Sequence, residues 1–118
     1  MLPVMSKDEM REPVFWILTT LTQGRQHGYG IIRKSTTLSG GSVTLAVTTL
    51  YSSLERLEEE GLVRSDGEEV VEGRLRRYYV LTPAGSERLL IETDRLEAKV
   101  RTVRSQFSKR SVAALGNA

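Results

Sequence analysis

The sequence predicts a mainly α-helical fold with one two-stranded β-hairpin, which makes it an α+β domain. Leucines recur at helical spacing over residues 50–57, and Gly61 follows as a helix stop. Residues 62–81 hold two segments rich in β-branched and aromatic side chains, with Glu72-Gly73 as the turn between them. Thr82-Pro83 then opens a new helix. The order helix, hairpin, helix predicts a winged helix-turn-helix followed by a C-terminal dimerisation helix.

The composition is that of a soluble globular protein, because 118 residues with 39% apolar and 27% charged side chains suffice for one modest core. The net charge of +2 is too small to indicate a nucleic-acid partner, so any basic surface must come from local clustering. Without cysteine and with a single histidine, the chain lacks the ligands for disulfides, thiolate sites and histidine-based metal sites. We therefore expect no metal and no cofactor.

The charge pattern argues against a signal peptide and against a membrane span. Charged residues at positions 7–12 fall where the apolar region of a signal peptide would lie. The longest uncharged run, residues 35–54, consists mainly of Ser, Thr and Gly and is too polar for a bilayer. We therefore expect a cytoplasmic protein without membrane contact.

The first helix has two possible starts. Ser6–Glu9 has the spacing of a capping box, so the helix begins there and kinks at Pro13, or it begins near Glu12 with Pro13 in its first turn. Residues 14–18 are apolar on more than one face. Since a surface helix needs only one apolar stripe, this pattern predicts cover by its own domain and by a partner chain. Gly24 ends the helix.

A short second helix is expected from about His27 to Leu38, because a Ser-Gly-Gly-Ser sequence then interrupts it. Its inner side is expected to carry Tyr29, Ile32 and Leu38, and its outer side Arg33 and Lys34. His27 is interpreted as a capping or packing residue, since no nucleophile is arranged with it for catalysis. The Tyr29 hydroxyl either contacts a DNA phosphate or packs. Arg25, Arg33 and Lys34 either contact the DNA backbone or are ordinary surface charges.

The third helix, from about Leu45 to Glu60, has chemically different ends. Its buried stripe is Leu50, Leu54 and Leu57. Its first turns carry the polar residues Thr48, Thr49, Tyr51, Ser52 and Ser53, and its last turns carry Glu55, Glu58, Glu59 and Glu60. Phosphate repels the acidic end, so the N-terminal end should face DNA, as recognition helices usually do. Alternatively, the hydroxyls are there only because Ser and Thr cap helices well.

The hairpin has two candidate turns and a basic tip. Glu72-Gly73 is preferred over Asp66-Gly67, because Val70-Val71 can then pair with the second strand. Three arginines follow this turn: Arg74 and Arg76 should share one face of the strand, and Arg77 should take the other. Such a tip can straddle phosphates or enter a minor groove. The alternative is a solvated edge hairpin whose charges deter strand pairing.

The C-terminal helix is expected to run from Thr82 to about Ser108. A mainly apolar set of residues alternates steps of four and three along it, at Leu89, Thr93, Leu96, Val100, Val103 and Phe107. This heptad-like spacing favours pairing with a second copy over folding back as a strap onto its own domain. The expected domains are a DNA-binding domain at 1–81, a dimerisation helix at 82–110 and a frayed tail at 111–118.

In the order and spacing of its motifs the chain resembles the PadR family of bacterial transcription regulators. The matching stretches are His27-Gly28-Tyr29 with Ile31 and Ile32, Thr49-Leu50-Tyr51 with Leu54 and Leu57, Glu58–Leu62, Gly73-Arg74 before Arg76–Tyr79, and Leu81-Thr82 with Gly85. The resemblance covers about residues 12–96, and the single C-terminal helix resembles the smaller subfamily. It implies a homodimeric repressor that pairs through its first and last helices and binds pseudo-palindromic double-stranded DNA operators. It also implies release by a small aromatic or cationic effector in some members.

The resemblance and the residue pattern together select two sets of candidate residues. The candidate DNA contacts are Tyr29, Arg33, Thr48, Thr49, Tyr51, Ser52, Arg74, Arg76 and Arg77. The candidate dimer interface is Phe15, Trp16, Leu89, Leu96, Val100, Val103 and Phe107. One departure stands out: Ala46-Val47-Thr48 replaces the Ser-Pro-Gly common in the family. Because Ala is a poor cap, Thr44 or Ser42 is expected to cap an earlier helix start.

Two other functions are compatible with the sequence. One is a small-molecule sensor whose main site is a hydrophobic pocket at the dimer interface, lined by Phe15, Trp16 and Phe107, although these aromatics equally suit plain packing. The other is a winged helix that binds proteins and never touches DNA. An enzyme is not expected, because the sequence shows no nucleophile–base pair, phosphate loop or metal cluster.

Overall fold

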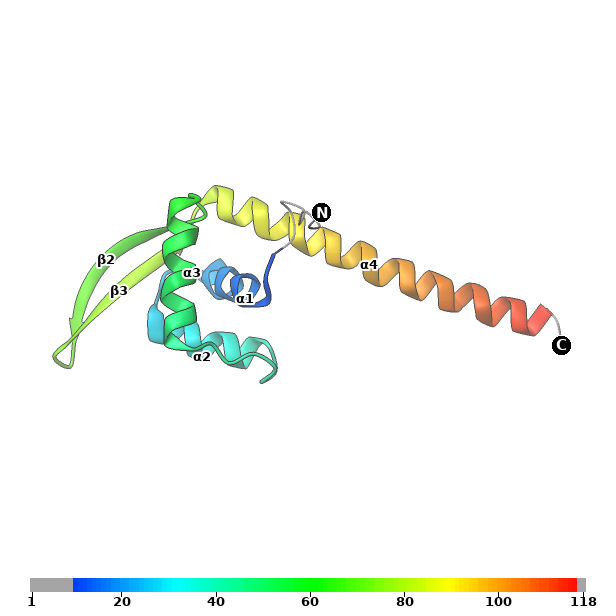
Figure 1. The fold of residues 1–118 in the computed structure, drawn as a ribbon, viewed down its shortest axis with the longest axis horizontal. Helices are drawn as coiled ribbons and strands as arrows, with labels where there is room; N and C mark the ends of the chain where they lie inside the picture. The colour runs from blue at the N-terminus through cyan, green and yellow to red at the C-terminus, as the bar shows by residue number, and fades with distance from the viewer. Residues whose placement is uncertain (1–9, 117–118) are drawn as a thin grey trace, which may run out of the picture.

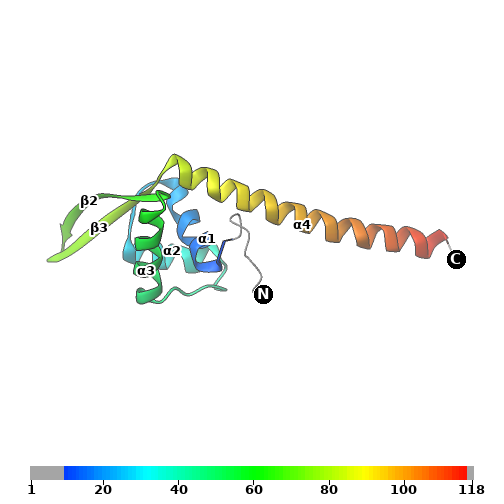
Figure 2. The ribbon, with the colours of Figure 1, turned by 45° about the horizontal axis from the view of Figure 1, so that its top comes forward.

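The structure, a computed structural model, describes residues 10–116, with side chains as far as residue 111. The elements in chain order are α1 (Glu12–Thr20), the 3-10 turn η1 (Leu21–Gln23), β1 (Gln26–His27), α2 (Gly28–Leu38), α3 (Val47–Glu59), β2 (Val63–Val71), β3 (Arg74–Leu81) and α4 (Pro83–Gly116). The hairpin β2–β3 projects from one side of the short helices and α4 from the other (Figures 1 and 2). The molecule is therefore elongated, at 71 × 34 × 27 Å. We call residues 10–95 the head and residues 96–116 of α4 the arm.

Helix α1 begins at Glu12 with Pro13 in its first turn, which confirms the second of the two predicted starts. The capping-box sequence Ser6–Glu9 lies outside the described residues. The helix tightens into η1 and ends at Gly24, whose φ of 136° is open to glycine but strained for other residues. Ile17 and Leu18 are fully buried in the head. Cover of the other face by a partner chain stays a prediction.

The core is built where α1, α2 and α3 meet the base of the hairpin. Its fully or almost fully buried residues include Ile17, Leu18, Ile31, Leu50, Leu54, Leu57, Leu62, Val63 and Tyr79. The leucine stripe of α3 lies in this core, as the spacing predicted. For α2 the predicted inner side is partly wrong: Tyr29 and Leu38 are exposed, and the buried positions are Gly28, Gly30, Ile31 and Ser35. The register of a short helix with few apolar residues is decided by its neighbours and not by its own pattern.

Helix α3 starts at Val47, and its N-cap is Ala46, whose side chain makes no cap hydrogen bond. The predicted earlier start capped by Thr44 or Ser42 is therefore wrong. Leu45 is buried, so it anchors the chain just before the helix and sets where the helix can begin. The first backbone N–H groups of α3 are consequently left without a side-chain partner.

The sheet has three strands in the order β1-β3-β2, all antiparallel. Val70 pairs with Leu75 and Val71 with Arg74, which confirms Glu72-Gly73 as the turn. Both turn residues have positive φ, 52° and 77°, as a two-residue hairpin turn requires. The competing Asp66-Gly67 dipeptide forms a register shift within β2 instead. The sequence did not predict β1, because a two-residue strand carries no periodicity.

Helix α4 is longer than predicted. Thr82 caps it, with its Oγ1 accepting from the Gly85 N–H at 3.0 Å, but the helix continues to Gly116 and not to about Ser108. Its 34 residues span about 51 Å at 1.5 Å per residue. Leu89, a candidate dimer-interface residue, packs into the head's own core within the single chain. Among the described residues no helix combines the length and the apolar composition that a membrane span requires.

Candidate nucleic-acid interface

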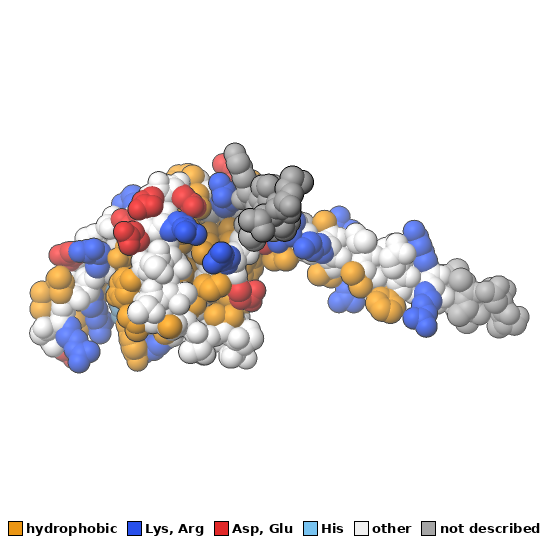
Figure 3. All heavy atoms as spheres, viewed as in Figure 1, with side chains coloured by type: hydrophobic (Ala, Val, Ile, Leu, Met, Phe, Trp, Pro, Cys, Tyr) orange, Lys and Arg blue, Asp and Glu red, His pale blue; other side chains and the backbone are white. Residues whose placement is uncertain are grey.

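The two ends of α3 face opposite sides of the head. In Figure 1 the N-terminal end of α3 and the tip of the hairpin lie on the lower side, away from the start of α4. Acidic side chains gather over the other end of α3, next to α4 (Figure 3). The arrangement gives the head one side that a polyanion can approach and one that repels it.

The polar residues at the start of α3 point in different directions. Thr48 and Ser52 are both exposed, and Ser52 borders the same hollow beside Arg11 and Val14 that Thr49 lines. Thr49 is half-buried and faces the beginning of α1, beside Arg11 and Val14. Tyr51 leans to the opposite flank, over the N-terminus of α2. Among these four, Thr48 and Ser52 are therefore the best placed to meet a base edge, and Thr49 the least.

The His-Gly-Tyr-Gly sequence is explained by how α2 begins. His27 is the N-cap, and its Nδ1 accepts the Gly30 N–H at 3.2 Å. A side chain at Gly28 would clash with Tyr51, because its Cβ would lie 2.5 Å from the Tyr51 Oη. Burial lowers the pKa of His27, and the nearby Arg76 and Arg33 lower it further. A neutral His27 is what the cap requires, since only the unprotonated nitrogen can accept.

Tyr29 and Arg33 form an exposed pair one turn apart on α2. The Arg33 guanidinium lies 5.5 Å from the centre of the Tyr29 ring, within the range of a cation–π contact. Tyr29 is 62% exposed, which is unusual for a tyrosine in a small domain. Both side chains are exposed, and they border a hollow that is also lined by Thr19 and Thr22 at the end of α1.

The hairpin is not basic as a whole. From Val63 to Leu81 it carries four arginines and four carboxylates: Arg64, Arg74, Arg76 and Arg77 against Asp66, Glu68, Glu69 and Glu72. Its formal net charge is therefore zero. Any attraction for phosphate must come from which arginines are neutralised by neighbours and which are not.

Of the three arginines that follow the turn, Arg77 forms an ion pair. Its Nη2 lies 3.2 Å from Glu68 Oε1, and it faces the glutamates of α3 together with Tyr79. The hydrogen bond to Glu68 raises the pKa of Arg77, and the nearby tyrosine raises it further. Arg74 and Arg76 lie on the other face, as predicted, and neither forms an ion pair with any residue that the structure describes. These two are the available wing cations.

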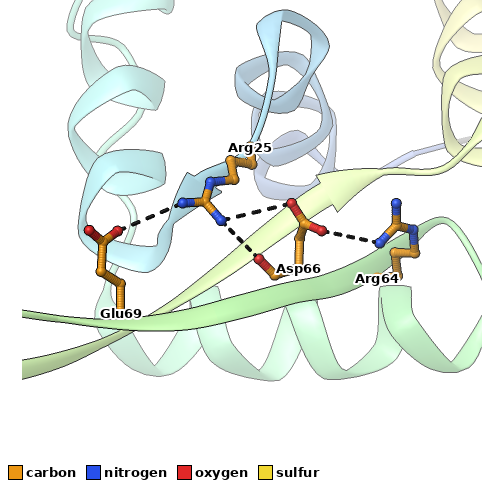
Figure 4. A network of polar contacts seen from close by, with 4 residues as sticks. All are labelled: Arg25, Arg64, Asp66 and Glu69. Atoms are coloured by element: carbon orange, nitrogen blue, oxygen red, sulfur yellow. Dashed lines mark hydrogen bonds and ion pairs between the residues drawn. The ribbon is translucent and has the colours of Figure 1, made fainter.

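Arg25, the residue just before β1, contacts Asp66 and Glu69 in the middle of β2 (Figure 4). Its guanidinium stacks 4.0 Å from the centre of the Tyr78 ring. Its Nη1 donates to the Asp66 carbonyl oxygen at 3.1 Å, and its Nη2 lies 3.7 Å from Glu69 Oε2. The sequence offered no signal for this network, because Arg25 and Asp66 are 41 positions apart.

A second surface, the arm seam, consists of Leu96, Val100, Val103 and Phe107. These residues share one face of α4, and Val100, Val103 and Phe107 are 53%, 54% and 62% exposed. In Figure 3 apolar side chains follow one edge of α4 beyond the head. On α1, Phe15 and Trp16 meet edge to face with ring centres 5.1 Å apart, and both are half-buried.

Residues 17–90 match the transcriptional regulator PadR-like family, which is more than half of the chain. The chain belongs to this family. Over 55 residues it is 47% identical to transcriptional regulator Rv3488 of Mycobacterium tuberculosis, and the match spans 47% of this chain and half of that protein's length.

Solved structures of other regulators have the same architecture as this PadR-like chain. A PadR family transcription regulator from Clostridium difficile has a TM-score of 0.66 at 26% identity, covering 82% of this chain and 98% of that one. A transcriptional regulator from Clostridium thermocellum also reaches 0.66, at 27% identity over 78% and 89%. Bacillus subtilis PadR, solved in complex with operator DNA, is similar in fold, with a TM-score of 0.60 at 24% identity over 67% and 46%.

Proposed function

We propose that this PadR-like chain is a homodimeric repressor that inserts the N-terminal end of α3 into the major groove of a pseudo-palindromic operator. The observation that carries the proposal is the common side shared by the start of α3 and the wing tip, with the acidic end of α3 turned away (Figures 1 and 3). A recognition helix docks by its N-terminal residues, and here those are exposed hydroxyls and uncapped N–H groups.

The contacts divide into two kinds. Thr48 and Ser52 are proposed to meet base edges, with Tyr51 beside them. Tyr29 and Arg33 on α2, and Arg74 and Arg76 on the wing, are proposed to contact phosphates, which position the protein without reading sequence. Thr49 and Arg77, which face α1 and Glu68, are proposed to support these contacts from within the head.

Two heads are proposed to be joined through the arm seams, with α1 beside them. The side chains of the arm seam have the spacing of residues that pack against a partner helix, and in the single chain they are exposed. A symmetric dimer would place its two α3 helices in successive major grooves, with half-sites about 34 Å apart.

The test is a selection of genomic DNA fragments bound by the purified full-length chain, with light scattering to give the mass in solution. We expect a dimer mass and enriched fragments that share an inverted repeat. A dimer that enriches no fragment, even at low salt, would contradict the proposal and favour a winged helix that binds proteins. A monomer that binds single half-sites would contradict the dimer alone.

The wing is tested by Arg74→Ala combined with Arg76→Ala. We expect weaker binding to all sequences and a salt slope that is smaller by up to about 2, because each phosphate contact contributes about 0.9. Arg77→Ala is the matched control, since its charge is already engaged by Glu68, and it should change the slope less. Equal slopes in fluorescence anisotropy titrations of wild type and double variant would rule out the wing contact.

A second proposed activity is effector binding beside α1. It is favoured by the Phe15–Trp16 pair, which stays half-buried in the single chain on the helix that packs against α4. A planar aromatic compound stacked there would change the fluorescence of Trp16, the chain's one tryptophan. No change across a panel of such compounds, with DNA binding intact, would exclude an effector site at this position.

A further inference from the structure

The residue paired with Arg76 in the hairpin ladder is Glu69 on β2. Residues directly opposite in an antiparallel pair have Cβ atoms about 4.5–5.5 Å apart, so opposite charges there normally neutralise each other. Here they do not. Glu69 is held by Arg25 at 3.7 Å, and Arg76 has no ion-pair partner within residues 10–116.

Arg25 reaches Glu69 because three other contacts aim its guanidinium. The Tyr78 ring lies beneath it at 4.0 Å, and the Asp66 carbonyl oxygen accepts from Nη1 at 3.1 Å. The Asp66 carboxylate lies a little farther away, at 4.0 Å. That carbonyl is offered at the register shift in β2, where Gly67 has a φ of 87°. Figure 4 shows the Arg25 guanidinium between Asp66 and Glu69. Arg76 and Tyr78 are two residues apart on β3, so the guanidinium that stacks on Tyr78 lies over the face of the hairpin that also carries Arg76.

The network has little value for stability. Arg25 and Glu69 keep about half of their side-chain surface exposed, at 47% and 52%, and ion pairs this exposed contribute little to folding. What the network does change is the charge that a DNA strand would meet on this face. The Arg25 guanidinium pairs with the Glu69 carboxylate, which would otherwise neutralise Arg76.

We propose that Arg25 is a positioning residue for DNA binding, which occupies Glu69 and so leaves Arg76 free for a phosphate. This inference rests on the proposed function, since Arg76 needs to be free only if the wing meets DNA. Without the Arg25 side chain, Glu69 pairs with Arg76 across the ladder, and the wing offers phosphate a neutralised pair.

The decisive experiment is a double-mutant cycle between Arg25 and Glu69, measured by anisotropy on the fragment enriched in the genomic selection. Arg25→Ala should weaken binding by about three- to tenfold, the size of one charge-assisted contact at a solvated surface. In the Glu69→Gln background the same change should have almost no effect, because no carboxylate remains to capture Arg76. The Arg76→Ala background should abolish the effect as well. An equal loss in all three backgrounds overturns the proposal, since Arg25 would then contact DNA directly.

Arg64→Ala is the matched control. It removes a guanidinium that lies 3.4 Å from the other oxygen of Asp66, but it leaves Glu69 with Arg25. Binding should stay at the wild-type level. A loss equal to that of Arg25→Ala would overturn the proposal, because general charge reduction would then explain both variants.

A measurement without DNA separates this inference from the proposed function. In NMR spectra of the free protein, Arg25→Ala should slow the hydrogen exchange of the Arg76 Nε–H, because Glu69 becomes its acceptor. Unchanged exchange overturns the inference whatever the protein binds. Slower hydrogen exchange in a protein that binds no DNA would support the change of the Glu69 partner from Arg25 to Arg76, while it would reject the proposed function.

Discussion

The head and the arm carry the same kind of apolar spacing and use it in opposite ways. In α3 the leucines at positions 50, 54 and 57 are almost completely buried by other parts of the chain. In the arm, residues at the same steps of three and four stay exposed, with Val103 at 54%. The comparison teaches that periodicity marks a face to be covered but does not say by which chain. In the head the chain itself provides the cover, and in the arm we propose that a second copy does.

The sharpest way to break this comparison is to charge the arm seam with Val100→Asp and Val103→Asp. We expect a folded monomer, because both side chains are exposed in the single chain. Operator affinity should fall about 100-fold or more, since two linked half-site contacts become one. Light scattering and anisotropy measure the two effects.

Ala98→Asp with Ser105→Asp is the control, with the same added charge on the opposite face of the helix. These positions should tolerate the change and leave a dimer. A dimer that survives both pairs of substitutions would mean that the arm seam is not the interface.

The next largest effect belongs to the head alone. Leu54→Ala should cost about 2–5 kcal/mol of unfolding free energy, because it leaves a cavity in a fully packed core. Val103→Ala, made in a variant that already carries Val100→Asp, should cost less than about 0.5 kcal/mol of unfolding free energy. Urea titrations compare the two. Similar costs would show that the arm folds against its own head.

Glu92 lies at the joint between the two regions, and its effect should be intermediate. It is 2% exposed, and Arg95 donates to its two carboxylate oxygens at 2.7 and 2.6 Å. Arg95 holds the pKa of Glu92 below its usual 4.5. Its contribution is thus present above pH 4.5 and is lost as the pH falls through the lowered pKa.

Glu92→Gln should cost about 1–3 kcal/mol at neutral pH, because it removes the charge that Arg95 pairs with. The variant should also lose part of the acid dependence of the unfolding free energy. If wild type and variant show the same profile below pH 4.5, the ionised Glu92–Arg95 pair does not stabilise the folded state.

The smallest expected effect is the pH dependence of the α2 cap. The pKa of His27 is lowered below 6.5, so the folded state binds fewer protons than the unfolded state just below that pH. Its stabilising contribution is therefore complete above pH 6.5 and is lost as the pH falls through the lowered pKa. His27→Asn keeps a capping side chain that does not titrate. Thermal unfolding across this range should show wild type losing stability relative to the variant as the pH falls, and a constant difference would contradict the capping role.

Most elements could be predicted because their signals are local. Thr82-Pro83, Glu72-Gly73 and the leucine stripe of α3 each act over a few residues, and the structure confirms all three. The start of α3 could not be predicted this way. It depends on the burial of Leu45, which is a tertiary event, and the helix begins after an alanine that caps poorly.

The candidate interface was predicted less completely than the fold. Residue type selected three wing arginines, but only their neighbours across the ladder separate Arg77, which Glu68 engages, from Arg74 and Arg76. Likewise, Tyr29 was expected inside and lies outside, because Gly28 and Ile31 fill the space against α1 and α3. The chemistry of each side chain could be predicted from the sequence, whereas its neighbours in the folded protein could not.

By itself, then, the sequence determined the helices, the hairpin turn and the family, because caps, turn dipeptides and periodic leucines act within a few residues of chain. Only the tertiary structure decided which charges remain available. Arg25 meets Glu69 across 44 positions, through a tyrosine on one strand and a bulge in another. Electrostatic pairing depends on distance in space, and strand register sets that distance, so the working charge of the wing appears only once the chain is folded.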